Sequence, residues 1–153
     1  MLALLVALPA TAQDFHKGLA AHKRGEYVTA LREWRLLAEK GDAEAQYKLG
    51  FMYERGQGVL KNDREAVKWF RNAAEQGHAR AQYSLGLRYL WGDGAPKNIV
   101  LAYKWWSLSS LLGHQKAGSY LDKAAKLMTP AEIAKSRKLV REWWANHKKK
   151  PPS

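Results

Sequence analysis

Cysteine is absent from this chain of 153 residues. Its absence excludes disulfide bonds and thiol chemistry and leaves histidine and carboxylate side chains as the available metal ligands. Long apolar runs are also missing. Apart from a short stretch at the N-terminus, no segment approaches the ~20 apolar residues of a membrane-spanning helix, so we expect no transmembrane segment. Hydrophobic residues make up 46% of the chain, an ordinary content for a folded domain.

Acidic residues are few compared with basic ones, 14 against 26, and the formal net charge is +12. Residues 123–150 contain nine Lys or Arg and two Glu. Such a surface favours anionic partners, whether nucleic acid, lipid headgroups, acidic glycans or acidic proteins. We expect no specific nucleic-acid recognition, and a solvated helix face with a lysine tail is the simpler alternative. The candidate basic patch consists of Lys135, Arg137, Lys138, Arg141, Lys148, Lys149 and Lys150.

A period of 36 residues dominates the sequence. Residues 41–76 and 77–112 align without a gap and share 15 identical positions. A repeat of this length is typical of a solenoid, whose units cannot bury their apolar faces alone. It favours a protein that holds a partner on its surface over an enzyme with a pocket.

Each unit is expected to form two antiparallel helices. In residues 41–76, apolar positions at 3.6-residue spacing predict helices over about 42–55 and 63–76. Gly56 is placed to end the first helix in the left-handed conformation, and Asp63 to cap the second. In the next unit Asn98 is the expected cap.

Glycine recurs inside the first helix of three units, at Gly18, Gly50 and Gly86. There it costs about 1 kcal/mol relative to alanine. We therefore expect the neighbouring helix to cross too closely for a side chain to fit.

The complete array is predicted to be all-α, a right-handed α–α superhelix of about four antiparallel helix pairs. The predicted last helix begins at a capping box, Thr129 to Glu132, with proline at its first position. The expected segments are a signal peptide over 1–12, a shorter helix pair over 13–40, the repeats 41–76 and 77–112, a divergent capping pair over 113–148, and a basic, proline-containing tail over 149–153.

The N-terminus has the pattern of a secretory signal. The apolar run Leu2–Leu8 precedes Ala10-Thr11-Ala12, a small-residue cleavage motif. Because no basic residue precedes the run, we expect the true start to lie upstream or the chain to be clipped. A first apolar helix that packs on the solenoid is the alternative. The interpretation predicts a periplasmic or secreted protein.

The motif of the first repeat is Ala45-Gln46-Tyr47-x-Leu49-Gly50-x-x-Tyr53-x-x-Gly56-x-Gly58-Val59, then Asp63-x-x-Ala66-x-x-Trp69. This motif and its copy resemble Sel1-like repeats, longer-looped relatives of the tetratricopeptide repeat. Residues 18–38 resemble a plain tetratricopeptide unit. Since members of this family serve as adaptors for many partners, the resemblance implies an interaction scaffold without naming its partner.

In tetratricopeptide-like arrays, residues at i, i+4 and i+8 of each first helix line a concave groove. The resemblance therefore implies a groove that is aromatic and aliphatic in the middle and basic at its C-terminal end. It would suit a segment with apolar anchors and acidic residues. The alternative is that these side chains pack against adjacent helices. The candidate groove residues are Tyr47, Phe51, Arg55, Tyr83, Leu87, Trp91 and Lys123.

The remaining motifs are better explained by the fold than by ligand binding or catalysis. The two Gly-x-Gly loops follow a helix and recur with the repeat, so turn geometry explains them better than phosphate binding. His78 and His114 share one repeat position and are expected to be cap or loop residues. No residue set has the spacing of a catalytic triad. We expect no catalysis, no metal and no cofactor.

Six of the seven tryptophans fall into two groups, and the seventh is Trp91 of the candidate groove. Four lie at core-like spacing on second helices: Trp34, Trp69, Trp105 and Trp106. The pair Trp143-Trp144 is expected to cover the open end of the array, with an interfacial membrane anchor as the alternative. The sequence thus predicts a protein-binding scaffold of the cell envelope, with polyanion binding through the basic helix as the second hypothesis and a hydrolase as a remote third.

Overall fold

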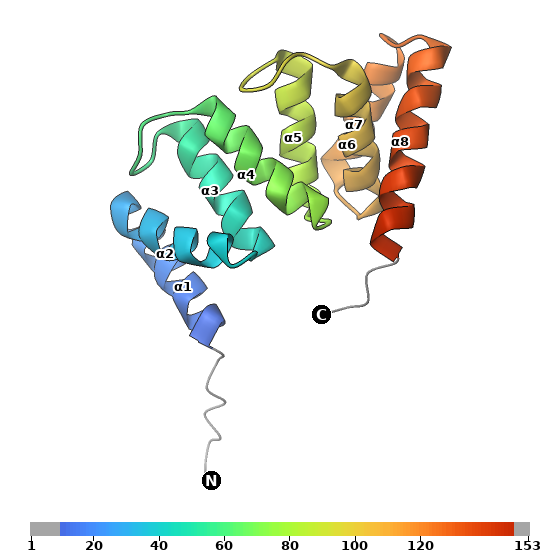
Figure 1. Cartoon of the computed structure of the whole chain (residues 1–153). Coiled ribbons are helices and arrows are strands. Elements are labelled where there is room, and N and C mark those ends of the chain that lie inside the picture. The colour runs from blue at the N-terminus through green and yellow to red at the C-terminus, as the bar shows by residue number, and fades with distance from the viewer. Residues whose placement is uncertain (1–9, 149–153) are drawn as a thin grey trace.

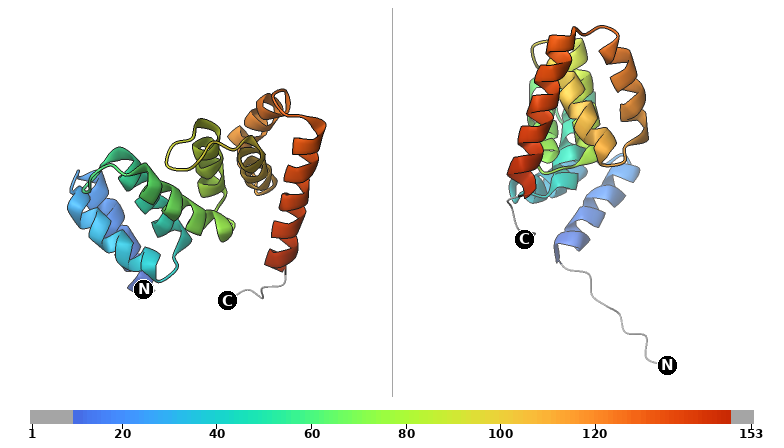
Figure 2. Two further views of the ribbon diagram at one scale, coloured as in Figure 1. Left: turned by 45° about the horizontal axis from the view of Figure 1, so that its top comes forward. Right: turned by 90° about the vertical axis from the view of Figure 1, so that its right-hand side faces the viewer.

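The computed structural model describes residues 10–148, and every regular element in this range is an α-helix. Consecutive helices stack into a curved array (Figures 1 and 2), which confirms the all-α solenoid. Residues 1–9 of the predicted signal peptide lie outside the described range, and Ala10 to Ala12 form the start of α1. The helices are α1 (Ala10–Lys23), α2 (Tyr27–Glu39), α3 (Ala43–Arg55), α4 (Asp63–Glu75), α5 (Ala79–Trp91), α6 (Ile99–Leu111), α7 (Gln115–Ala125) and α8 (Pro130–Lys148).

Side-chain caps fix the helix starts and correct one prediction. The Asn62 side chain accepts a hydrogen bond from the Glu65 backbone N–H at 3.1 Å, so Asn62 caps α4. Asp63 is already the first helical residue, where its charge favours the positive end of the helix dipole. Asn98 caps α6 as predicted. Gly56 ends α3 with a left-handed φ of 65°, also as predicted.

The recurrent glycines inside the first helices make room for an aromatic ring. A Cβ added to Gly50 would lie 2.5 Å from Cδ1 of Phe70, and one added to Gly86 would lie 2.7 Å from Cδ1 of Trp106. The first unit repeats this arrangement between Gly18 and its own tryptophan. The predicted close crossing is confirmed, and the ring that fills the space comes from the second helix of the same unit.

The Gly-x-Gly loops also have a packing role. Gly58 has a φ of 70°, and a Cβ on it would lie 2.6 Å from the carbonyl carbon of Tyr27. Gly94 has a φ of 75° and meets the backbone at Asp63 in the same way. Each loop therefore lies against the start of the second helix of the preceding unit, where only glycine satisfies both the conformation and the close approach.

Polar side chains join neighbouring units at equivalent positions. Arg71 of α4 donates to the Tyr89 hydroxyl of α5 at 2.6 Å, and Arg35 donates to Tyr53 at the same distance one unit earlier. The Gln82 amide donates to a backbone carbonyl at the end of α4. Because these bonds recur with the repeat, they fix the stacking register.

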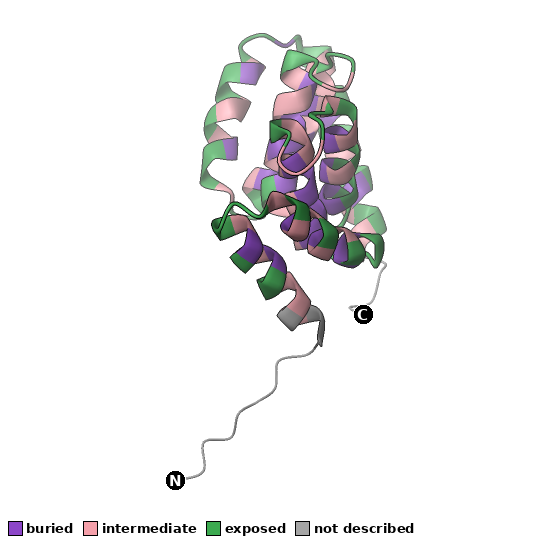
Figure 3. Cartoon of the chain, turned by 90° about the vertical axis from the view of Figure 1, so that its left-hand side faces the viewer, coloured by how far each residue is buried: buried purple, intermediate pink, exposed green. Residues whose placement is uncertain are grey.

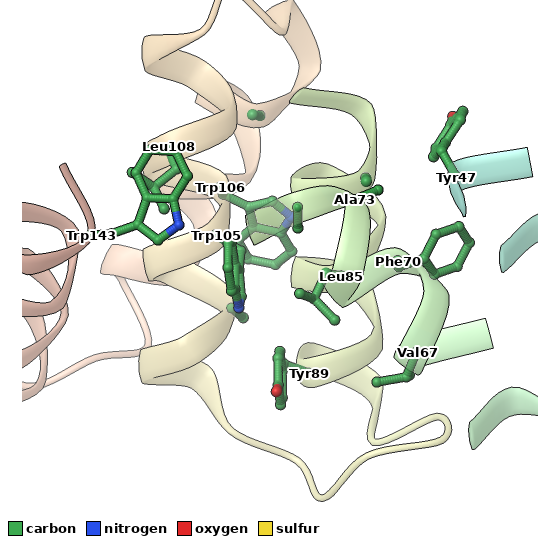
Figure 4. Packing of buried hydrophobic residues seen from close by; sticks show 14 of the residues in the cluster. Tyr47, Val67, Phe70, Ala73, Leu85, Tyr89, Trp105, Trp106, Leu108 and Trp143 are labelled. Atoms are coloured by element: carbon green, nitrogen blue, oxygen red, sulfur yellow. The ribbon is translucent and has the colours of Figure 1, made fainter. Parts of the chain in front are cut away.

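Buried positions recur along the helices of the array (Figure 3) and belong to two hydrophobic clusters. Trp105 and Trp106 of α6 lie among the core side chains in Figure 4, together with Phe70 and Leu85. Trp34 is buried in a second cluster at the N-terminal end. Of the four tryptophans predicted to be structural, three are buried, whereas Trp69 is only partly so.

The C-terminal end departs from the repeat, because α7 and α8 both pack on α6. The capping box is confirmed: the Thr129 N–H donates to Glu132 at 2.8 Å, and the Glu132 N–H donates back to the threonine hydroxyl at 3.2 Å. Trp143 is only 6% exposed and donates to the Glu75 carboxylate at 2.9 Å. Its burial agrees with the cap interpretation and leaves it unavailable as a membrane anchor.

Candidate partner-binding groove

Three hollows follow one face of the array, which is formed by α3, α5 and α7 and is called the groove below. The first has a volume of about 270 Å³ and is lined by Tyr47, Phe51 and Arg55, together with His22 and Arg80. The Arg55 guanidinium lies 5.1 Å from the Phe51 ring centroid, and that of Arg80 lies 5.8 Å from the Tyr47 ring. Both pairs are within the range of a cation–π interaction.

The second hollow, of about 400 Å³, shares Tyr47, Phe51 and Arg80 with the first and adds Tyr83 and His114. The two hollows therefore lie next to each other. Tyr47 is only 8% exposed, so its ring mainly packs and offers one edge to the surface. Burial, helped by a hydrogen bond with the neighbouring tyrosine of α7, raises the pKa of Tyr83 to about 12.

The third hollow, of about 260 Å³, lies at the other end of α5 and has an apolar lining that includes Trp91 and Leu127, with Lys123. Trp91 is 65% exposed. Tyr120 connects this hollow to the second, because its ring contacts Tyr83 at 5.5 Å and lines the third hollow itself. The predicted groove residue Leu87 is partly buried and packs against the main core.

Positive charge extends along the whole groove. Five Lys or Arg side chains line its hollows. Lys48 pairs with Glu44 at 3.5 Å, and the ion pairs within residues 10–148 include none of the other four. These four cations are Arg55, Arg80, Lys116 and Lys123. The nearby carboxylates are already engaged: Glu44 contacts His78 at 2.7 Å, and Glu54 contacts Arg88 at 2.9 Å.

Sequence reasoning missed Arg80, Tyr120 and His114 as groove residues. Arg80 could have been found, because it occupies the repeat position of Glu44 and reverses its charge within an otherwise matching pair of units. Tyr120 lies in the divergent last unit, where the i, i+4, i+8 stripe selected Lys123 instead.

The predicted basic patch lies on the exposed side of α8. Lys135, Arg137, Lys138 and Arg141 are all exposed, and Lys138 is 3.9 Å from the exposed carboxylate of Glu142. This helix contributes no side chain to the three groove hollows, so the patch is a separate surface. Lys149 and Lys150 lie outside the described residues, as does the side chain of Lys148.

His78 and His114 both stand directly before a helix. His78 caps α5 by accepting the Ala81 N–H at 3.1 Å, and His114 occupies the same position before α7 without a side-chain cap bond. In the part of the chain that the structure describes, no cluster of three His, Asp or Glu side chains is placed to hold a metal ion. None of the helices within 10–148 has the length and apolarity needed to cross a bilayer.

A family model described as Sel1 repeat matches residues 43–78 and 79–114. The chain therefore contains two Sel1 repeats. The matched blocks keep the 36-residue period and begin two residues after the boundaries drawn from identities alone. Sel1 repeat proteins generally act as protein-interaction scaffolds and are typically non-catalytic.

Solved Sel1-type structures share the fold. The crystal structure of c5321, a protective antigen of uropathogenic Escherichia coli strains with an SLR fold, gives a TM-score of 0.81 at 28% identity and covers 94% of this chain and 33% of that one. The Sel1 repeat protein from Oxalobacter formigenes gives 0.69 at 34% identity, over 73% and 48% of the two chains. Helicobacter pylori cysteine-rich protein B has a TM-score of 0.60 at 20% identity, which shows a likeness of fold alone.

Among curated proteins, the similarity is confined to a short segment. The exopolysaccharide production negative regulator of Rhizobium meliloti (strain 1021) is 41% identical over 54 residues, and that of Rhizobium leguminosarum bv. viciae is 39% identical over the same length. The match spans 35% of this chain and 20% of each relative, so it covers about a fifth of the proteins that carry that name.

Proposed function

We propose that this Sel1 repeat protein is a non-catalytic scaffold of the cell envelope that binds a segment of a partner protein in the groove of α3, α5 and α7. The observation that carries the proposal is the pairing of exposed cations with aromatic rings at the groove surface. Arg55 lies over Phe51 and Arg80 over Tyr47, and neither cation forms an ion pair within the described residues.

The groove has the features of a peptide-binding surface. Aromatic and arginine side chains contribute most of the binding energy at protein interfaces when partners exclude water from them. The exposed indole of Trp91 beside the third hollow offers an apolar contact of this kind. The unpaired cations along the groove favour acidic residues in the same partner segment and would speed its association.

The groove is tested by crosslinking followed by affinity measurement. A photoreactive amino acid at Phe51 captures the partner in cells, and titration calorimetry then compares purified variants. We expect Trp91→Ala and Arg55→Ala each to weaken binding by about tenfold, or about 1.4 kcal/mol. The matched control is Leu111→Ala on α6, where a side chain of 64% exposure lies outside the hollows. Unchanged affinity in the double variant Tyr83→Ala, Trp91→Ala would show the groove assignment to be wrong.

The envelope location rests on the apolar run and cleavage motif at residues 1–12. Mass spectrometry of the mature protein from fractionated cells tests it, with cleavage after Ala12 as the expected result. An intact N-terminus in the cytoplasmic fraction would contradict it.

A second candidate function is polyanion binding through α8. The observation that favours it is the exposure of four cations on one helix, of which only Lys138 has a nearby carboxylate within the described residues. Such binding releases counterions, so affinity for a polyanion such as heparin should fall steeply as salt is raised. Affinity that is flat between low and physiological salt would exclude it.

A further inference from the structure

Two successive junctions between units have a histidine and a tyrosine in the same places but differ in the charged residue beside them. At the first junction, Nδ1 of His78 accepts the Ala81 N–H at 3.1 Å, so the imidazole proton lies on Nε2 and points to the Glu44 carboxylate at 2.7 Å. The imidazole also lies against the Tyr47 ring, with centroids 4.7 Å apart. A glutamate from the preceding unit is thus held at the start of α5.

The next junction repeats the imidazole and the tyrosine but lacks the glutamate. His114 stacks on Tyr83 with ring centroids 4.5 Å apart and an interplanar angle of 24°, whereas His78 and its tyrosine are tilted by 34°. The position of Glu44 is occupied 36 residues later by Arg80. The first turn of α7 contains no acidic residue, and Nδ1 of His114 is buried without a hydrogen-bond partner in the described part of the chain.

This junction opens onto the second hollow, of about 400 Å³, whose lining includes Tyr83, Arg80, His114 and Lys116. Neither cation is in an ion pair within residues 10–148. Burial first, then the charges of Lys116 and Arg80, lower the pKa of His114. The shift favours the neutral imidazole, which has one N–H to donate. The hollow therefore combines two cations, a neutral N–H donor and the positive end of α7.

We propose that this hollow binds a glutamate side chain of the partner segment, in the position that Glu44 occupies at the preceding junction. The inference rests on the proposed groove function and specifies the residue that the groove selects. A carboxylate at Nε2 of His114 would fix the tautomer that leaves Nδ1 free to accept from the first turn of α7, as His78 does for α5. Glutamate is chosen because the chain itself supplies glutamate at the equivalent place.

The first test needs no partner. Arg80→Glu places the carboxylate inside the chain, and Arg80→Gln removes the cation without adding an acid. We expect the imidazole ¹⁵N spectrum of Arg80→Glu to show His114 with a proton fixed on Nε2, as for His78, and its urea midpoint to exceed that of Arg80→Gln. Identical His114 spectra and midpoints in the two variants would overturn the proposal.

The second test uses C-terminally amidated peptide pools that differ at one fixed position, Glu, Gln or phosphoserine, among apolar and random neighbours. The wild-type chain should bind the Glu pool about tenfold more tightly than the Gln pool, and Arg80→Gln should lose that preference while Leu111→Ala keeps it. Equal binding of the Glu and Gln pools would refute the glutamate site and leave the groove in place. A stronger, Arg80-dependent response to phosphoserine would reassign the hollow to phosphate. Binding of no pool would contradict the groove function itself, and the Arg80→Glu spectra would still decide whether the hollow accepts a carboxylate.

Discussion

Replacing Gly86 with alanine tests the relation between glycine and aromatic ring that repeats along this array. A Cβ at this position would lie 2.7 Å from Cδ1 of Trp106. The indole is 1% exposed and donates to the Tyr83 carbonyl at 3.2 Å, so it cannot move without losing a hydrogen bond worth about 1 kcal/mol. Overpacking of a filled core costs about 1–3 kcal/mol, and the better helix propensity of alanine returns about 1 kcal/mol. We expect a net loss of about 1–3 kcal/mol.

The same array contains the matched control. Gly118 is also inside a first helix, but a Cβ there would meet only the Ser110 hydroxyl at 3.8 Å, an ordinary contact. Because the added methyl group meets no clash, only the higher helix propensity of alanine affects stability. Gly118→Ala should therefore stabilise the chain by about 0.5–1 kcal/mol. Urea denaturation followed by far-UV circular dichroism and by tryptophan fluorescence measures both variants, and coincident transitions justify a two-state analysis. If Gly86→Ala were neutral or stabilising, the indole would not be what excludes a side chain at this position.

Two further predictions concern the helix starts and pH. Asn62→Ala should lower the free energy of unfolding by about 1 kcal/mol because it removes the cap of α4. Asp63→Ala should lower it by only about 0.3 kcal/mol. Equal losses of the two variants in urea denaturation would indicate that Asp63 contributes as much as the cap. The hydrogen bond from His78 lowers the pKa of Glu44 from its ordinary 4.5 to about 2. The contribution of ionised Glu44 to the free energy of unfolding is therefore complete above pH 4.5 and is lost as the pH falls through about 2. The urea midpoint of the wild type should exceed that of Glu44→Gln at neutral pH, by a margin that shrinks below pH 4.5, and a margin independent of pH would contradict this linkage.

The parts of the fold that depend on the repeat could be predicted from sequence. The helix pairs of the repeats, the C-terminal glycine of α3 and the close crossing at Gly50 follow from residue type and spacing. The capping box before α8 lies outside the repeats and follows from its own local motif. The cap of α4 was assigned wrongly because Asn62 and Asp63 are adjacent and either can cap a helix; only the backbone distinguishes them. In the last unit the covering role of Trp143 could be predicted, but its partner could not, because α8 reaches Glu75, which lies far away in the sequence.

The groove was less predictable for a physical reason. Stacking requires the glycine, the ring that fills its space and the arginine-to-tyrosine bond, and these recur at Gly50 and Gly86. The second residue of each first helix takes no part in that framework. This position can therefore vary between units, and it is occupied in turn by Glu44, Arg80 and Lys116. Glu44 accepts a hydrogen bond from His78 within the chain. At the next junction, Arg80 and Lys116 line the hollow that His114 faces, and Nδ1 of His114 has no hydrogen-bond partner in the described part of the chain. Specificity in this array is therefore expected at positions where the repeat breaks without disturbing the stack, such as the second residue of α3, α5 and α7.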